Sequence, residues 1–194
     1  EGFLDVAMCQ SALLEEAANH KDVDAVIVGC FDDTGLDALR CVFSVPVVGI
    51  GEAAYHAASL VSHRFSVVTT LSRSVAGISD NLNNYGLTKR CVSVRATDIP
   101  VLKLEENEPE SLDLIRLEIK AALNDDKAEA IVLGCAGMAN LLSQLSNEFK
   151  VPVIDGVACA VGFAETLVAA GIKTSKISTY VSNTDKYTGL DNRY

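Results

Sequence analysis

The chain carries one motif twice, as Asp24-Ala25-Val26-Ile27-Val28-Gly29-Cys30 and as Glu129-Ala130-Ile131-Val132-Leu133-Gly134-Cys135. Each copy is an acidic residue, a short apolar run and then Gly-Cys. The copies stay in step downstream, where Val45-Pro46-Val47 corresponds to Val151-Pro152-Val153. The cysteines are 105 residues apart (135 − 30), and the downstream segments are 106 apart (151 − 45). A duplication of this size predicts two similar halves, with Cys30 and Cys135 facing each other across a shared cleft.

Composition argues against several classes of partner. The 194 residues are 49% hydrophobic, which is enough for a well-buried core, and the formal net charge of −10 argues against nucleic acid and anionic membranes. The six cysteines include no Cys-x-x-Cys pair, and no His-Glu-x-x-His motif occurs, so a metal site has little support. We expect reduced thiols in a cytoplasmic protein, with four of them as small buried hydrophobic side chains: Cys9, Cys41, Cys91 and Cys159.

Apolar runs of strand length alternate with helical patterns along the chain. Strands are expected at residues 25–28, 45–50, 65–69, 91–94, 130–133 and 151–154. These runs are rich in Val and Ile and are continuously apolar, which is typical of parallel strands covered on both faces. Helices are expected at residues 52–61, 74–84, 111–123, 139–149 and 158–170. The alternation indicates an α/β fold with parallel sheets flanked by helices.

The duplication also predicts how the chain is divided. The second copy begins with the strand at 65–69, and the offset places its counterpart about 40 residues before residue 1. We therefore expect two pseudo-symmetric lobes with parallel four-stranded sheets, the N-terminal part of the first lobe being absent from this sequence. Residues 1–63, completed by 165–194, form the first lobe in this prediction, and residues 64–164 form the second. The active site lies in the cleft between them.

Two structural expectations follow for the first lobe. The strand at 25–28 should have an unfilled neighbour, because the strands that would precede it are missing from the repeat. The chain should open with a helix that gathers apolar side chains on one face, namely Leu4, Ala7, Met8, Leu14 and Ala18.

Both repeated cysteines end a strand, which is where open α/β sheets bind ligands. Each is followed by a turn and a helix. We therefore expect a helix N-terminus to lower the pKa of each thiol and its N–H groups to hold an oxyanion. Asp33 or Thr34 can cap the helix after Cys30. One thiol on each face of a carbon atom suits proton transfer between two bases without a cofactor.

Other polar residues also fall at strand ends. Thr69 and Thr70 end the strand at 65–69 and suit a substrate carbonyl or carboxylate, although Thr70 or Ser72 can instead cap the next helix. Asp155 follows the strand at 151–154 and can either bind a substrate N–H group or cap a helix.

Two further interpretations, dinucleotide binding and thiol redox chemistry, belong to a different class of function. Gly49-Ile50-Gly51-Glu52-Ala53-Ala54 matches the dinucleotide fingerprint G-x-G-x-x-A after a strand, but no acidic residue ends the next strand. The alternative is a tight strand-to-helix turn with close packing. Glu52 and His56 lie one helical turn apart and can share a hydrogen bond. The six cysteines are also compatible with a thiol redox protein.

Together these motifs resemble the aspartate/glutamate/hydantoin racemase superfamily, and more narrowly its hydantoin and allantoin racemase branch. The resemblance rests on the two Gly-Cys motifs, on residues 30–40 and 49–53, and on Leu133-Gly134-Cys135-Ala136-Gly137-Met138. It implies that Cys30 and Cys135 are the catalytic residues. It also implies a substrate-binding site formed by Phe31, Thr69, Thr70, Ala136 and Gly137.

The resemblance implies a cofactor-independent racemase of 5-substituted hydantoins such as allantoin. Acidic-amino-acid racemases usually carry Thr and a further polar residue after the second cysteine, whereas Ala136-Gly137 favours a neutral ring substrate. A small-molecule substrate, no nucleic acid or membrane partner and a homo-oligomer are expected. An amino-acid racemase, a maleate-type isomerase, a decarboxylase and a non-catalytic dinucleotide- or metabolite-binding module remain as alternatives.

Overall fold

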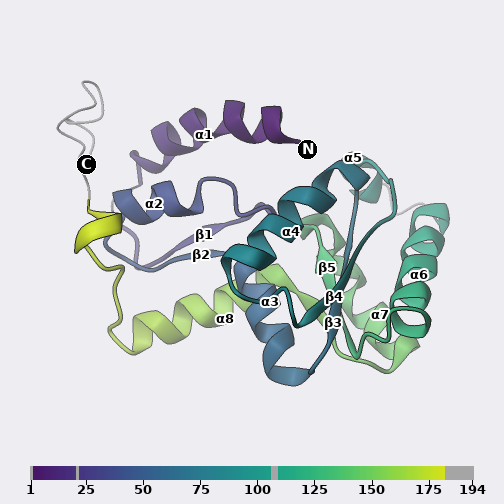
Figure 1. Ribbon diagram of the computed structural model, residues 1–194. Helices are drawn as coiled ribbons and strands as arrows, with labels where there is room; N and C mark the ends of the chain where they lie inside the picture. The colour runs from purple at the N-terminus through teal and green to yellow at the C-terminus, as the bar shows by residue number, and fades with distance from the viewer. Residues whose placement is uncertain (1, 21, 106–108, 182–194) are drawn as a thin grey trace.

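Helices surround two parallel β-sheets in the computed structural model, which describes residues 2–20, 22–105 and 109–181 (Figure 1). The strands are β1 (Val26–Val28), β2 (Val47–Gly49), β3 (Phe65–Thr69), β4 (Cys91–Ala96), β5 (Ala130–Gly134) and β6 (Val153–Asp155). The α-helices are α1 (Phe3–Ala17), α2 (Leu36–Val42), α3 (Ile50–Val61), α4 (Val75–Asn84), α5 (Val101–Glu105), α6 (Pro109–Asn124), α7 (Leu142–Phe149) and α8 (Gly156–Ala169). Short 3₁₀ helices are η1 (Ser72–Ser74), η2 (Ala136–Leu141) and η3 (Ser178–Tyr180).

The predicted α/β class is confirmed, because every strand lies within two residues of its expected place and all strand pairs are parallel. Among the expected helices, one boundary differs by more than two residues. The helix expected at 139–149 begins at Leu142, since the residues after Cys135 first form the 3₁₀ helix η2. None of the helices in the described ranges is long and apolar enough to cross a bilayer.

The larger sheet has the strand order β4-β3-β5-β6 and is covered on both faces. Alternate residues of β3 and β5 point to opposite faces, so Val67 and Val132 pack with α3, α4 and α8. Val68 and Leu133 lie in the other core, with side chains of α6 and α7. Burial on both faces explains why these strands are continuously apolar. It also fixes the register that places Thr69 of β3 beside Gly134 of β5.

The smaller sheet consists of β1 and β2, with Val28 of β1 beside Gly49 of β2. The helices α1 and α2 lie on one side of it and α8 on the other (Figure 1). Within the described residues β1 pairs with β2 alone, as expected for a strand with an unfilled neighbour. Residues after α8 return to this sheet, because Thr174 donates to the carbonyl oxygens of Ser44 and Val45. The predicted contribution of residues 182–194 lies outside the described residues.

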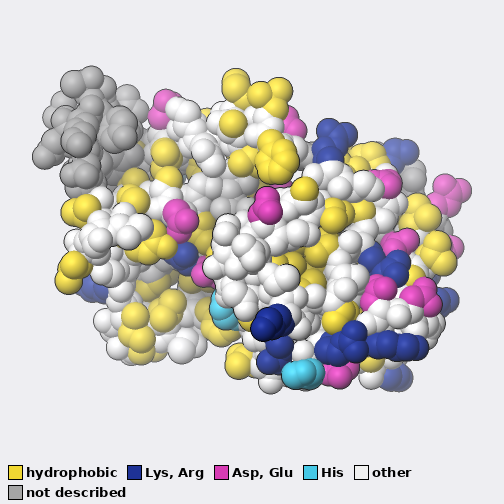
Figure 2. All heavy atoms as spheres, in the orientation of Figure 1, with side chains coloured by type: hydrophobic (Ala, Val, Ile, Leu, Met, Phe, Trp, Pro, Cys, Tyr) yellow, Lys and Arg dark blue, Asp and Glu magenta, His cyan; other side chains and the backbone are white. Residues whose placement is uncertain are grey.

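The opening helix α1 forms where it was predicted, but the N-terminal half of its apolar face is exposed. Leu4 and Met8 are 74% and 73% exposed, and no residue of α1 is fully buried. Figure 2 shows hydrophobic side chains gathered over α1 at the top of the molecule. Only the C-terminal half of the helix packs, through partly buried Leu13, Leu14 and Ala17. This half holds α1 over the ends of the strands that carry the candidate site.

Candidate active site

A cavity of about 330 Å³ opens between the C-terminal ends of β3 and β5 and the loop after β1. It brings together Cys30 and Cys135, the two halves of the repeated motif. Its lining is formed by Asp5, Val6, Cys9, Cys30, Phe31, Asp32, Thr34, Thr69, Thr70, Ser74, Val101, Gly134 and Cys135. Five of the seven residues expected from the sequence therefore line one cavity, and Ala136 and Gly137 lie just outside its lining. A Cβ atom added at Gly137 would lie 3.7 Å from the Cys135 sulfur.

Cys135 is positioned by the strand before it and the short helix after it. Its carbonyl oxygen accepts a hydrogen bond of 3.0 Å from the Met138 N–H, and Cys135 occupies the N-cap position of η2. The expected helix N-terminus after this thiol is therefore present, as a six-residue 3₁₀ helix.

The two threonines at the end of β3 differ in what they do. The Thr69 hydroxyl donates a 3.0 Å hydrogen bond to the carbonyl oxygen of Gly134, and the side chain is buried. Thr70 is also buried, and its carbonyl oxygen accepts from the Thr97 hydroxyl. The alternative that Thr70 or Ser72 caps a helix is wrong, because neither η1 nor α4 has a side-chain cap.

Cys30 is exposed at the start of the turn after β1, and the Thr34 hydroxyl lies 3.4 Å from its sulfur. Either atom can donate in this pair. The helix after Cys30 starts only at Leu36, with Gly35 in the left-handed conformation at its N-cap. The expected order of a turn and then a helix after Cys30 is therefore present.

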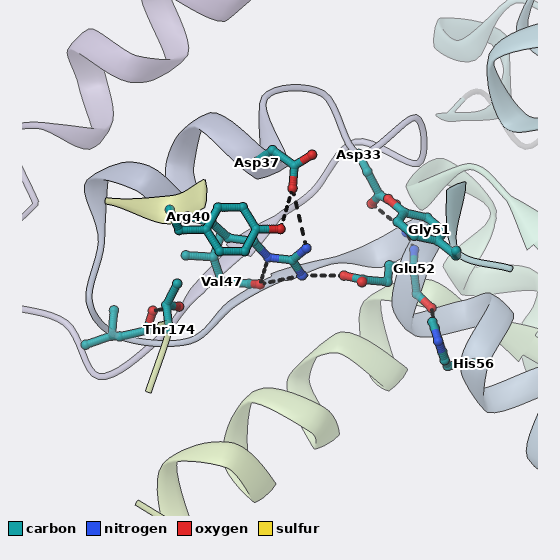
Figure 3. Close-up of polar contacts among 11 residues, drawn as sticks. Asp33, Asp37, Arg40, Val47, Gly51, Glu52, His56 and Thr174 are labelled. Atoms are coloured by element: carbon teal, nitrogen blue, oxygen red, sulfur yellow. Dashed lines mark hydrogen bonds and ion pairs between the residues drawn. The ribbon is translucent and has the colours of Figure 1, made fainter. Parts of the chain in front are cut away.

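Both capping expectations for this turn are wrong, because neither Thr34 nor Asp33 caps α2, which has no side-chain cap at its N-terminus, and Asp33 has other partners. Its carboxylate instead accepts hydrogen bonds from the N–H groups of Gly51 (2.9 Å) and Glu52 (2.7 Å) at the start of α3 (Figure 3). A dinucleotide bound at the Gly49-x-Gly51 turn would place its pyrophosphate on these same N–H groups. A carboxylate of the chain already occupies that position, which argues against the dinucleotide interpretation.

Two other expectations concerned Glu52, His56 and Asp155. The Glu52 carboxylate pairs with Arg40 (2.5 Å), whereas His56 Nδ1 contacts the backbone oxygen of Glu52 at 2.8 Å (Figure 3). Asp155 caps α8, since its carboxylate accepts from the N–H groups of Val157 and Ala158. Asp155 is absent from the lining of the cavity, so the capping interpretation holds.

Eight of the lining residues were not predicted as site residues, and three of these belong to α1: Asp5, Val6 and Cys9. The expectation that Cys9 is buried is wrong, because its side chain is exposed, while the other three cysteines expected in the core are only partly buried: Cys41, Cys91 and Cys159. Asp32 lies two residues after Cys30, so the sequence could have indicated it as a site residue. Burial raises the pKa of the Asp32 carboxyl above its ordinary value. No local pattern places α1 over the site, because that contact depends on how the helix packs against α2.

A second cavity, of about 490 Å³, runs along β1 and shares Cys9, Cys30 and Thr34 with the first. Its other walls are mostly apolar side chains, with the ion pair of Glu16 and His20 (2.9 Å) at one part of its lining. The smaller cavity holds both repeated cysteines and the two threonines, so it is the better candidate for acid–base chemistry. In the described ranges no group of three or more His, Cys, Asp or Glu side chains has a geometry that would hold a metal ion.

The chain is similar to several known proteins over most of its length. Residues 1–164 match the family model described as Asp/Glu/Hydantoin racemase. A hydantoin racemase of Rhizobium meliloti is 49% identical over 182 residues, covering 93% of this chain and 76% of that protein. Among solved structures, the allantoin racemase from Klebsiella pneumoniae is similar with a TM-score of 0.90 at 41% identity, covering 94% of this chain and 75% of the other. The allantoin racemase from Pseudomonas fluorescens gives 0.89 at 42% identity, covering 94% and 78%. The chain therefore belongs to the Asp/Glu/hydantoin racemase family and is a racemase, an enzyme of the isomerase class.

Proposed function

We propose that the protein racemises 5-substituted hydantoins, allantoin being one candidate, with Cys30 and Cys135 as the two acid–base groups. The observation that carries the proposal is that both cysteines line one cavity at the ends of their strands. Relatives with the names hydantoin racemase and allantoin racemase, at 41–49% identity over more than nine tenths of the chain, support the choice of substrate class. A volume of about 330 Å³ suits a small ring compound.

In the proposed mechanism one cysteine, as thiolate, takes the proton from the C5 carbon of the ring. The C–H bond breaks, and its electron pair moves into the adjacent carbonyl to give a planar enolate. The other cysteine, as thiol, gives its proton to the opposite face of C5 and becomes the thiolate. The roles exchange for the other enantiomer. Near-attack distances of about 3–3.5 Å on each side of C5 require the two sulfurs to lie roughly 6–7 Å apart.

The remaining site residues bind and orient the ring in this proposal. The Thr70 side chain and the backbone N–H groups at Ala136 and Gly137 donate to the enolate oxygen. Because the Thr69 hydroxyl already donates to Gly134, its role toward substrate is limited to its lone pairs, which can accept from a ring N–H group. Phe31 lines the cavity, and its ring packs edge-on against Tyr55 in the core.

The proposal extends to the protein as a whole. We assign residues 1–63 with 165–194 to one lobe and residues 64–164 to the other. The reaction requires no cofactor, because the carbonyl groups next to C5 already acidify its C–H bond. A cytoplasmic location is proposed because the cysteine spacings are not those of a small secreted domain held by disulfides. We also propose a homo-oligomer with a small-molecule substrate and without a nucleic acid or membrane partner.

The test is proton NMR of single-enantiomer hydantoins, including S-allantoin, in deuterium oxide with wild type, Cys30→Ser and Cys135→Ser. Each variant should lose racemisation in both directions, because a hydroxyl is a far weaker acid and base than a thiol near neutral pH. Each can still exchange the C5 proton of the one enantiomer whose base it keeps, without inverting it. Cys41→Ser is the matched control, since Cys41 lines neither of the two cavities described above. Full racemisation by either site variant would remove that cysteine from the mechanism.

A further inference from the structure

The carboxylate of Asp33 lies at a junction of three elements. It accepts hydrogen bonds from the N–H groups of Gly51 and Glu52 in α3, and the Tyr85 hydroxyl after α4 donates to it at 2.8 Å. Asp33 is only 7% exposed. The turn after β1 is therefore tied both to the helix that follows β2 and to the helix that follows β3.

Gly49 and Gly51 lie so close to the Asp33 carboxylate that a side chain at either position would clash with it. A Cβ atom at Gly49 would lie 2.1 Å from Oδ1 of Asp33, and one at Gly51 would lie 2.8 Å from Oδ2 and 2.4 Å from the Phe31 carbonyl oxygen. Backbone neighbours and a held carboxylate cannot move aside for such an atom. The Gly49-x-Gly51 pattern thus provides room for the turn that contains Cys30.

The turn itself has little freedom. Asp33 has a φ of 51°, in the left-handed region that costs a non-glycine residue energy unless the surroundings hold it there. Its N–H donates to the carbonyl oxygen of Cys30 at 3.0 Å. Asn81 of α4 donates to the carbonyl oxygen of Asp32 at 2.9 Å, a second bond between α4 and this turn. The place of Cys30 relative to the β3 and β5 ends is thereby set by α4.

We propose that Asp33 is the positioning residue for Cys30, and that its bonds to α3 and Tyr85 hold this thiol opposite Cys135. This inference rests on the proposed function, in which both sulfurs address one carbon atom. Asp33 lines neither cavity and acts through the turn, so it isn't a catalytic residue.

The same geometry makes the positioning depend on pH. Burial raises the pKa of Asp33 to about 6, against the lowering effect of the bonds from Tyr85, Glu52 and Gly51. The groups that face it are Tyr85 after α4, Tyr55 and Glu52 on α3 and the adjacent Asp32, while Arg40 of α2 holds Glu52. Burial and the Asp33 carboxylate raise the pKa of Tyr85, which keeps its hydroxyl a donor. A protonated Asp33 accepts these bonds less well, so racemisation should decline as pH falls through about 6.

The experiment compares wild type with Asp33→Asn, Tyr85→Phe and Glu52→Gln. Asparagine tolerates the left-handed conformation and matches Asp33 in size, but it puts an NH₂ group against one of the donors. We expect Asp33→Asn to lower kcat about 10- to 100-fold with little change in KM, and to lose the acid limb near pH 6. Tyr85→Phe, which keeps the ring, should lower kcat less. Glu52→Gln leaves the backbone N–H bond to Asp33 in place and should keep the acid limb.

A second readout does not require racemase activity. Dibromobimane joins two nearby thiols, and the yield of the Cys30–Cys135 cross-link at pH 8, relative to single alkylation of each thiol, reports their mutual placement by peptide mass spectrometry. The yield should fall at least about threefold in Asp33→Asn and in Tyr85→Phe, in line with a loss of orientation. Wild-type yields and an unchanged acid limb in both variants would overturn the inference. If wild type racemises no hydantoin but the cross-link depends on Asp33, the proposed substrate fails and the positioning role stands.

Discussion

The hydroxyl of Thr69 donates a 3.0 Å hydrogen bond to the carbonyl oxygen of Gly134, so the ends of β3 and β5 are joined by a side chain as well as by the sheet. Gly134 directly precedes Cys135. A Cβ atom at Gly134 would lie 2.8 Å from Cβ and 2.9 Å from Cα of Thr69. The close approach and the hydrogen bond together fix the end of β5, and thereby the position of Cys135 at the cavity.

Replacing Thr69 separates this role from substrate binding. Thr69→Val keeps the shape and removes the donor, so the free energy of unfolding should fall by about 1 kcal/mol, measured by urea denaturation. Thr69→Ser keeps the donor and should retain more of the racemase activity than Thr69→Val. Equal stability and activity of Thr69→Val and wild type would show that the bond to Gly134 has no such role.

Glycine substitutions give a paired test of the close approach. Gly134→Ala forces its new methyl group against Thr69 backbone and side-chain atoms, and it should lower the free energy of unfolding by about 1–3 kcal/mol. Gly162→Ala in α8 meets nothing within 4 Å and should raise stability by about 0.5–1 kcal/mol through helix propensity. Thermal unfolding of the two variants measures the difference. A Gly134→Ala protein as stable as Gly162→Ala would contradict the packing argument.

The strands and the two cysteines could be predicted because their signals are local and strong. A run such as 130–133 is apolar on both faces, and only a sheet covered on both sides uses such a run. The repeated motif then places Cys30 and Cys135 at equivalent strand ends without any knowledge of packing. The cavity that contains both thiols follows from the parallel topology, in which the C-terminal ends of strands meet.

The interactions that orient the site could not be predicted in this way. Capping rules assign Asp33 to the helix that follows in sequence, yet its left-handed φ turns the carboxylate back toward α3, 18 residues ahead. Likewise, helical periodicity predicts the helix α1 but not its position in the fold. Leu4 and Met8 on its apolar face are exposed, so burial of that face does not determine where the helix packs. Contacts between distant segments decide both features.

Asp155 should affect stability rather than turnover. Asp155→Ala removes the acceptor for the N–H groups of Val157 and Ala158, which should lower the free energy of unfolding by about 1 kcal/mol. Asp155→Asn keeps a capping oxygen and should lose only a few tenths of that value. Guanidinium unfolding measures stability, and racemisation by Asp155→Asn should equal that of wild type. A large decrease in kcat with an intact cap would instead assign Asp155 to the substrate.

The ion pair of Arg95 and Asp126 predicts a defined pH dependence of stability. Hydrogen bonds from Arg95 lower the pKa of Asp126 below its ordinary value of 3.8. The stabilisation is therefore complete above pH 4 or so and is lost as pH falls through the lower, folded-state pKa. Asp126→Asn should cost about 0.5–1 kcal/mol at pH 7 and progressively less below pH 4. Urea unfolding at both pH values checks this, and a difference that stays constant with pH would exclude the ion pair as its source.

The six thiols should react with iodoacetamide in an order set by exposure and burial. Burial raises the pKa of Cys91 to about 12, and burial likewise raises that of Cys159, so both are almost entirely protonated near neutral pH. At pH 8 a thiol with a pKa of about 12 has a thiolate fraction about a thousandfold below that of an ordinary cysteine. Cys9 and Cys30 are exposed and should be alkylated first.

Peptide mass spectrometry over a time course at pH 8 measures all six rates in one sample. A hydantoin present at saturation should slow Cys30, which lines the cavity with Cys135, and should leave the rate of Cys41 unchanged. Unfolding in guanidinium is the control, since it should bring all the rates together. Alkylation of Cys91 in the native protein as fast as Cys9 would show that the β3–β4 region opens readily, because its thiol can ionise only when water reaches it.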